Sequence, residues 1–138
     1  MATNPVEQIT AAYEEEKRNR RPPQTADDVP FAYEDITPEW LSLILGVGHL
    51  GAQVVSCRLD SPDDGNSNRR RIFIDWNDTG CEAGLPDRAF CKASQGLANR
   101  VSLGPSGAIR AEVNFYNLAR PLLDIEAPVA LHARYNAA

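Results

Sequence analysis

Residues 85–92 read Leu85-Pro86-Asp87-Arg88-Ala89-Phe90-Cys91-Lys92, which is typical of a turn followed by a short strand. Pro86 fixes the bend because its ring locks φ, and the residues after it are small or aromatic. Lys92 therefore lies at the end of an expected strand. From Ala108 the pattern becomes helical, with residues at offsets of three, four and seven on one face: Ile109, Glu112, Val113 and Tyr116.

Glu112 is the unusual member of this helical face, because the other three residues are apolar or aromatic. Burying a carboxylate without a partner costs several kcal/mol, so the sequence must supply a cation. Lys92, on the preceding strand, is the nearest plausible one. We therefore expect an ion pair between Lys92 and Glu112, although a strand lysine and a helix glutamate are also common as solvated surface charges.

The flanking segments predict the rest of an α+β fold. Thr37 is a good N-cap, followed by Pro38 at the first helical position, and this helix should end at Gly46. Alternation predicts strands over 53–59 and 70–76, with Ile72, Ile74 and Trp76 on one face. A further strand is expected over Val129–Tyr135, after Pro128. Together these segments predict an antiparallel sheet of about four strands, with the Glu112 helix packed on it and helices at the N-terminus.

The N-terminal part should form a separate unit. Residues 5–20 are compatible with a helix that has little apolar surface, and residues 20–30 contain three prolines and read as an extended linker. We therefore divide the chain into residues 1–30, a helix and proline-rich linker, and residues 31–138, the folded lobe. The first unit should be dispensable for the stability of the second.

The turn-forming residues 60–69 have two interpretations that the sequence leaves open. In the first, Asp60-Ser61-Pro62-Asp63-Asp64-Gly65-Asn66-Ser67-Asn68 is an ordinary hairpin loop. In the second, the loop folds over nucleotide phosphates and donates backbone N–H groups from Gly65, Asn66, Ser67 and Asn68. The acidic residues Asp63 and Asp64 would repel phosphate unless they point away.

Composition argues against several classes of function. The net charge is −5, from 14 basic and 19 acidic residues, and the basic clusters are short, which disfavours a nucleic-acid partner. Three cysteines without CxxC spacing and two histidines support neither a disulfide framework nor a zinc site. No apolar run is long enough to span a membrane and no signal sequence is evident, so we expect a cytoplasmic protein without a membrane partner.

The sequence around Lys92 and Glu112 resembles the N-terminal lobe of a phosphotransferase family. This family includes aminoglycoside phosphotransferases, choline kinases and the ecdysteroid kinase-like proteins. The resemblance covers residues 36–136 and is most specific at Gly84–Lys92 and Arg110–Tyr116, followed by Glu126-Ala127-Pro128-Val129. It extends upstream to Ile36-Thr37-Pro38-Glu39-Trp40-Leu41 and to the loop at Asp64–Asn68. It implies a protein-kinase-like N-terminal lobe.

The resemblance also implies a function. ATP and Mg²⁺ would be the cofactors, Lys92 would position the nucleotide phosphates, Glu112 would hold Lys92, and Gly65 to Asn68 would cover the phosphates. The acceptor would be a hydroxyl of an unidentified small molecule. The catalytic aspartate and the metal ligands belong to a second lobe that these residues lack, so we expect this chain alone to be inactive.

The main alternative is a non-catalytic binding or interaction module, in which Lys92 and Glu112 form a residual structural ion pair. In either case the edge of the strand over 129–135 would lack a partner, which favours self-association.

Overall fold

The computed structural model describes residues 3–136 and has an α+β fold with a four-stranded antiparallel sheet. Residues 1–2 and 137–138, at the outer ends of the two expected units, lie outside the described residues. In chain order the helices and strands are α1 (Pro5–Arg18), α2 (Pro38–Leu45), β1 (Val54–Leu59), β2 (Asp63–Asp64), β3 (Asn68–Trp76), α3 (Asp78–Glu82), β4 (Arg88–Ala93), α4 (Leu97–Leu103) and α5 (Ala108–Asn114).

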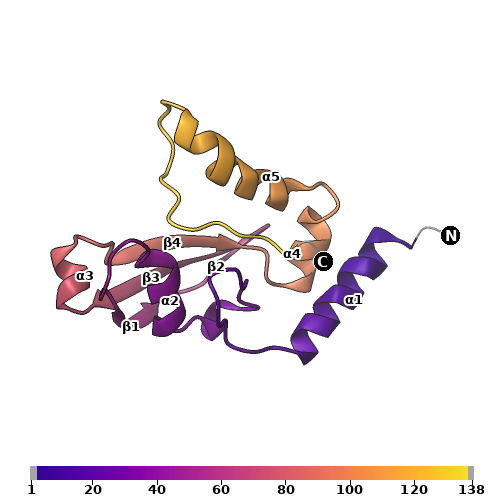
Figure 1. Ribbon diagram of the computed structural model, residues 1–138. Helices are drawn as coiled ribbons and strands as arrows, with labels where there is room; N and C mark the ends of the chain where they lie inside the picture. Colours follow the sequence, from indigo (N-terminus) through magenta and orange to yellow (C-terminus); the bar gives the residue numbers. More distant parts are fainter. Residues whose placement is uncertain (1–2, 137–138) are drawn as a thin grey trace.

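The sheet is built around β3, the longest strand. β1 and the short β2 both pair with one edge of β3, and β4 pairs with its other edge. All of these pairings are antiparallel, as expected for strands joined by short connections. β4, which carries Lys92, is therefore a strand at the edge of the sheet (Figure 1).

One face of the sheet forms the core. Ile72, Ile74 and Trp76 on β3 are buried, and they pack with Trp40 and Leu41 of α2. The strict alternation along β3 is the cause, because residues two apart in a strand point to the same face. The sequence prediction of this face is confirmed.

α2 begins and ends as its sequence predicts. The side chain of Thr37 accepts a hydrogen bond from the amide of Trp40 at 3.1 Å, and Pro38 occupies the first turn. Gly46 is the C-cap. This capped helix covers the sheet in front of β1 and β3 (Figure 1).

Two segments for which the sequence analysis predicts neither a helix nor a strand contain short helices. Residues 77–84 include α3, whose N-cap Asn77 accepts a hydrogen bond from the amide of Gly80 at 3.0 Å. The polar stretch 94–107 contains α4. α4 is anchored by tertiary contacts, described below, which no local pattern reveals.

The prediction of a strand over Val129–Tyr135 is wrong, because this segment is irregular and pairs with no strand of the sheet. It is held by side chains instead. Asn117 donates a hydrogen bond to the carbonyl of Ala133 at 3.0 Å, and the ring of His132 makes an edge contact with Trp40. The strand edge that we expected to drive self-association at these residues is therefore absent.

The helix of Glu112 is less buried than its periodicity predicts. None of the residues Ala108–Asn114 of α5 is fully buried, and the side chain of Glu112 is 43% exposed. Figure 1 shows α5 standing above β4 and continuing through a π-helical segment, Phe115–Ala119, and a 3-10 turn, Arg120–Leu122. The expectation of a core-facing carboxylate is therefore wrong, although the helix itself is present.

The first thirty residues contact the rest of the chain at several points. α1 contains no fully buried residue, as expected from its sequence, but it lies beside α4 (Figure 1). In the linker, the carbonyl of Thr25 accepts a hydrogen bond from the indole of Trp40 at 2.9 Å, and Pro23 is buried. The division at residue 30 stays a prediction.

Within residues 3–136, no helix is both long and apolar enough to cross a bilayer.

Candidate functional site

The ion pair expected from the sequence is present. The ammonium of Lys92 donates to both carboxylate oxygens of Glu112, each at 2.9 Å, and so connects the end of β4 to the middle of α5. Twenty residues separate the two partners, which makes this a tertiary contact. The prediction that they lie within ion-pairing distance is confirmed.

This pair is accessible to solvent, and that limits its contribution to stability. The side chains of Lys92 and Glu112 are 47% and 43% exposed. Ion pairs of this exposure contribute about 0–1 kcal/mol, because water screens the attraction and two long side chains lose conformational freedom. Accessibility also leaves the ammonium able to contact a ligand.

Lys92 belongs to a row of three charged residues across the sheet, two basic and one acidic. In the strand register, Lys92 lies opposite Arg69, and Arg69 lies opposite Asp63. Directly paired residues point to the same face, which is the face opposite the core. Arg69 forms an ion pair with Asp63 at 3.1 Å, so the acidic residue that we expected to repel phosphate is neutralised.

The candidate phosphate loop lies beside this row. Asp64 pairs with Asn68 across β2 and β3, and Asn68 in turn pairs with Ala93, the residue after Lys92. The sheet register therefore brings the backbone at the end of the loop next to the strand end that carries Lys92. Gly65, Asn66 and Ser67 form the tip, and the amide of Gly65 donates to the carbonyl of Ser67 at 3.0 Å.

The loop is a short, ordered hairpin in which Ser67 is buried, with only 8% of its surface exposed. The N–H groups of Asn66 and Ser67 make no hydrogen bond to any group in residues 3–136. Asp64 accepts a hydrogen bond from the side chain of Asn68 at 2.9 Å, which directs one carboxylate oxygen into the hairpin. Both interpretations of the loop, as a hairpin and as a phosphate cover, are compatible with this geometry.

Asn68 connects three parts of the fold. Its side-chain oxygen accepts hydrogen bonds from the amides of Gln95 and Gly96, at 2.8 and 3.4 Å, just before α4. Its carbonyl accepts a hydrogen bond from the hydroxyl of Tyr33 at 2.7 Å. Tyr33 is only 5% exposed, and burial raises the pKa of its hydroxyl well above the usual range, so it remains a donor.

Sequence reasoning missed three residues around the site: Arg69, Asn99 and Tyr33. Arg69 could have been found by counting outward from the Gly65 turn, because hairpin register places it opposite Asp63. Asn99 donates to the carbonyl of Gly65 at 2.7 Å across 34 positions of sequence, and Tyr33 contacts Asn68 across 35. No local signal marks either contact.

Cys91, next to Lys92, does not qualify as a nucleophile. It points to the core face of the sheet, opposite Lys92, and burial raises the pKa of its thiol to about 11. The thiol is therefore protonated at neutral pH.

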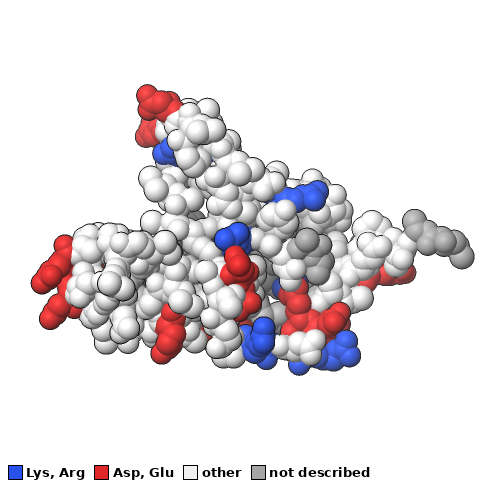
Figure 2. Space-filling view, viewed as in Figure 1, with Lys and Arg blue, Asp and Glu red and all other residues white. Residues whose placement is uncertain are grey.

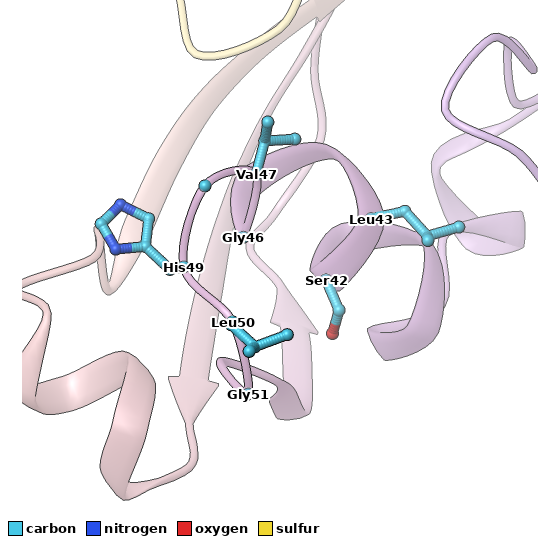
Figure 3. Close-up of a pocket in the computed structure, with 8 residues that line it drawn as sticks. Ser42, Leu43, Gly46, Val47, His49, Leu50 and Gly51 are labelled. Atoms are coloured by element: carbon cyan, nitrogen blue, oxygen red, sulfur yellow. The ribbon is translucent and has the colours of Figure 1, made fainter.

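Two depressions of the surface lie away from the candidate residues. The first, about 520 Å³, is formed by the end of α2 and the loop after it (Figure 3). Figure 3 shows Val47, His49 and Leu50 on that loop, and Leu50 is 100% exposed, so the depression is shallow. The second, about 430 Å³, lies between α1 and the linker. Neither is lined by Lys92 or Glu112.

Charge on the surface is mixed. Figure 2 shows basic and acidic side chains side by side near α1, and acidic atoms over α3, which contains Asp78 and Glu82. No group of three His, Cys, Asp or Glu side chains among residues 3–136 is arranged to hold a metal ion.

No family model, curated protein or solved structure matches the chain.

Proposed function

We propose that residues 31–138 are the nucleotide-binding part of an ATP-dependent phosphotransferase that acts on a hydroxyl of a small molecule. The observation that carries the proposal is the Lys92–Glu112 pair, with both contacts at 2.9 Å, which fixes a lysine at the end of an edge strand. A strand lysine held by a helix glutamate is the arrangement that kinase-like phosphotransferases use to position nucleotide phosphates, and this likeness supports the proposal.

Each residue of the site has a separate role in this proposal. Glu112 orients Lys92, and the exposed ammonium donates its remaining N–H to a phosphate oxygen. The amide of Asn66 donates from the loop, where it has no acceptor within residues 3–136. Arg69 forms an ion pair with Asp63 and so offsets one of the two acidic charges of the loop.

The residues fit the phosphates of ATP better than they fit Mg²⁺. The exposed loop amide of Asn66 and the oriented ammonium of Lys92 are donors from which phosphate oxygens accept hydrogen bonds. The described residues contain no cluster of three metal ligands, and the nearby carboxylates of Asp63 and Asp64 are engaged by Arg69 and Asn68. The proposal therefore assigns the Mg²⁺ ligands and the catalytic base to a second lobe.

An acyl-phosphate derivative of ATP tests the proposal directly. A lysine amine near the bound phosphates attacks the acyl carbon, forms an amide and releases ATP. The chain has only two lysines, Lys17 on α1 and Lys92, so Lys17 is an internal control. We expect mass spectrometry to find the label on Lys92, to find it reduced by excess ATP, and to find no ATP protection at Lys17.

Two variants sharpen this experiment. Glu112→Gln should reduce the ATP-protected labelling, because the lysine loses its orienting charge. Arg110→Gln, on the same helix, is the matched control and should label like the original chain. Equal labelling of both lysines, or labelling of Lys92 that ATP does not reduce, would refute the nucleotide site.

A non-catalytic interaction module is the second candidate. It is favoured by the contact of Asn99 with Gly65, since a loop tip fixed to a neighbouring helix suits a structural hairpin. This alternative predicts labelling of Lys92 that ATP does not affect.

A further inference from the structure

α4 carries two adjacent residues that reach different parts of the chain. The side-chain amide of Asn99 donates to the carbonyl of Gly65 at 2.7 Å and holds the tip of the β2–β3 loop. The guanidinium of Arg100 forms an ion pair with Glu16 of α1 at 2.8 Å. A seven-residue helix thus connects the N-terminal helix with the candidate phosphate loop.

The contact of Arg100 with the N-terminal region is substantially buried. Its side chain is 18% exposed and that of Glu16 is 27% exposed. The guanidinium also lies 5.2 Å from the ring of Tyr13 and 5.6 Å from that of Phe31. A partly desolvated ion pair flanked by two aromatic rings is a stronger attachment than the exposed pairs elsewhere on this surface.

The attachment of α4 to the loop is formed at both ends of the hairpin. Asn99 binds Gly65 at the tip, and the amides of Gln95 and Gly96 bind Asn68 at the base. A displacement of α4 would therefore change the position of the two amides between them, those of Asn66 and Ser67.

We propose that α1 is a positioning element for the phosphate loop and acts through Arg100 and Asn99 of α4. This inference rests on the proposed function, because it assigns the loop a ligand whose affinity depends on loop position. Arg100 and Asn99 are positioning residues. They hold the loop amides in place without touching the nucleotide.

Amide hydrogen exchange measured by NMR on the full chain tests the coupling without any ligand. The informative amides are Gly65, bonded to Ser67, and Gln95, bonded to Asn68. In Arg100→Met, which keeps the aliphatic stem, both should exchange about five- to tenfold faster, a factor that corresponds to losing one ordinary hydrogen bond. Arg100→Lys, which keeps the charge, should restore most of the protection.

Two controls separate local coupling from general destabilisation. The amide of Ile74, bonded to Asp87 at 2.7 Å in the core sheet, should exchange at an unchanged rate in Arg100→Met. Arg134→Met removes another ion pair with the N-terminal region, that with Asp27 at 3.1 Å, and should leave Gly65 and Gln95 unchanged. Unchanged Gly65 and Gln95 in Arg100→Met, or acceleration of Ile74 to the same extent, would overturn the positioning role.

A nucleotide measurement then completes the test. ATP protection of Lys92 against the acyl-phosphate probe should require about five- to tenfold more ATP in Arg100→Met than in the original chain. If the original chain shows no ATP protection, the proposed function fails, whereas the exchange result still decides the coupling of α1 to the loop. Equal ATP requirements in the two proteins would overturn the link between α1 and nucleotide affinity.

Discussion

The ammonium of Lys92 contacts both oxygens of Glu112, yet nearly half of each side chain remains exposed. A pair in this position stabilises the fold weakly. Under the proposed function, its main effect is to orient the ammonium toward a phosphate. Removal of the charge should consequently affect ligand binding much more than folding.

We predict that Lys92→Met lowers the melting temperature by no more than about 4 °C, because an exposed ion pair contributes about 0–1 kcal/mol. The same substitution should abolish ATP binding measured by calorimetry. Lys17→Met, at the other lysine, should leave both properties unchanged. A decrease of 10 °C or more would mean that the pair holds α5 on the sheet and has a structural role.

His132 gives the fold a pH dependence of its own. Its ring packs edge-on against Trp40, and its Nε2 is buried with no hydrogen-bond partner in residues 3–136. Burial lowers the pKa of this imidazole, the charge of Arg134 lowers it further, and Asp27 partly opposes both. Protonation therefore favours the unfolded chain, in which the pKa is near 6.5.

The sign of the effect follows from this depressed pKa. Above about pH 6.5 the imidazole is neutral in both states, and its contribution to stability is complete. As the pH falls through 6.5, the unfolded state binds a proton first, so the free energy of unfolding decreases. Urea titrations between pH 7.5 and 5.5 should show this decrease in the original chain and a smaller one in His132→Gln. If the free energy of unfolding fell equally steeply with pH in both proteins, the role of His132 would be contradicted.

At the level of elements, the N-terminal thirty residues fall into two parts with different roles. α1 has no fully buried residue, but the linker accepts the indole N–H of Trp40 at Thr25 and buries Pro23. The expectation that residues 1–30 are dispensable as a whole therefore needs to be tested in two steps.

We predict that a chain starting at Arg20 melts within about 4 °C of the full chain, because α1 buries little surface. A chain starting at Phe31 should lose about 5 °C or more, because the buried indole N–H of Trp40 is left without its acceptor at a cost of about 1–3 kcal/mol. Thermal unfolding followed by circular dichroism measures both. Equal losses would show that α1, and not the linker, carries the stabilising contacts.

For the molecule as a whole, no group of three His, Cys, Asp or Glu side chains among residues 3–136 is arranged to hold a metal ion. Phosphoryl transfer requires an oriented acceptor and positioned metal ions, which together contribute most of the rate. Under the proposed function, a second lobe would supply these groups.

We predict that these 138 residues neither phosphorylate a substrate nor hydrolyse ATP at a measurable rate, even when they bind it. Incubation with labelled ATP, Mg²⁺ and a panel of amino-sugars, choline and sterols, followed by chromatography, checks this. Turnover by the purified chain that is lost in Lys92→Met would contradict the assignment of the catalytic groups to a second lobe.

The amino-acid sequence alone determined the features that depend on neighbouring residues. Alternation along residues 70–76 predicted the core face of β3, and Thr37 with Pro38 predicted the start of α2. The charge of Glu112 on an otherwise apolar helical face predicted that Lys92 is its partner. The period of a helix or strand acts over a short range. The ion pair spans twenty residues, and it could be predicted because the Glu112 charge needs a cation and Lys92 is the one on the preceding strand.

Tertiary structure decided what depends on contacts between distant segments. Local periodicity could not show that α5 stands off the sheet with Glu112 half exposed, because burial depends on what covers the helix face. Residues 129–135 have the composition of a strand but no strand partner, and α4 exists in a polar stretch because Gly65, Asn68 and Glu16 bind it. A strand needs a partner for its backbone hydrogen bonds, and a short helix needs tertiary anchors, which only the folded chain supplies.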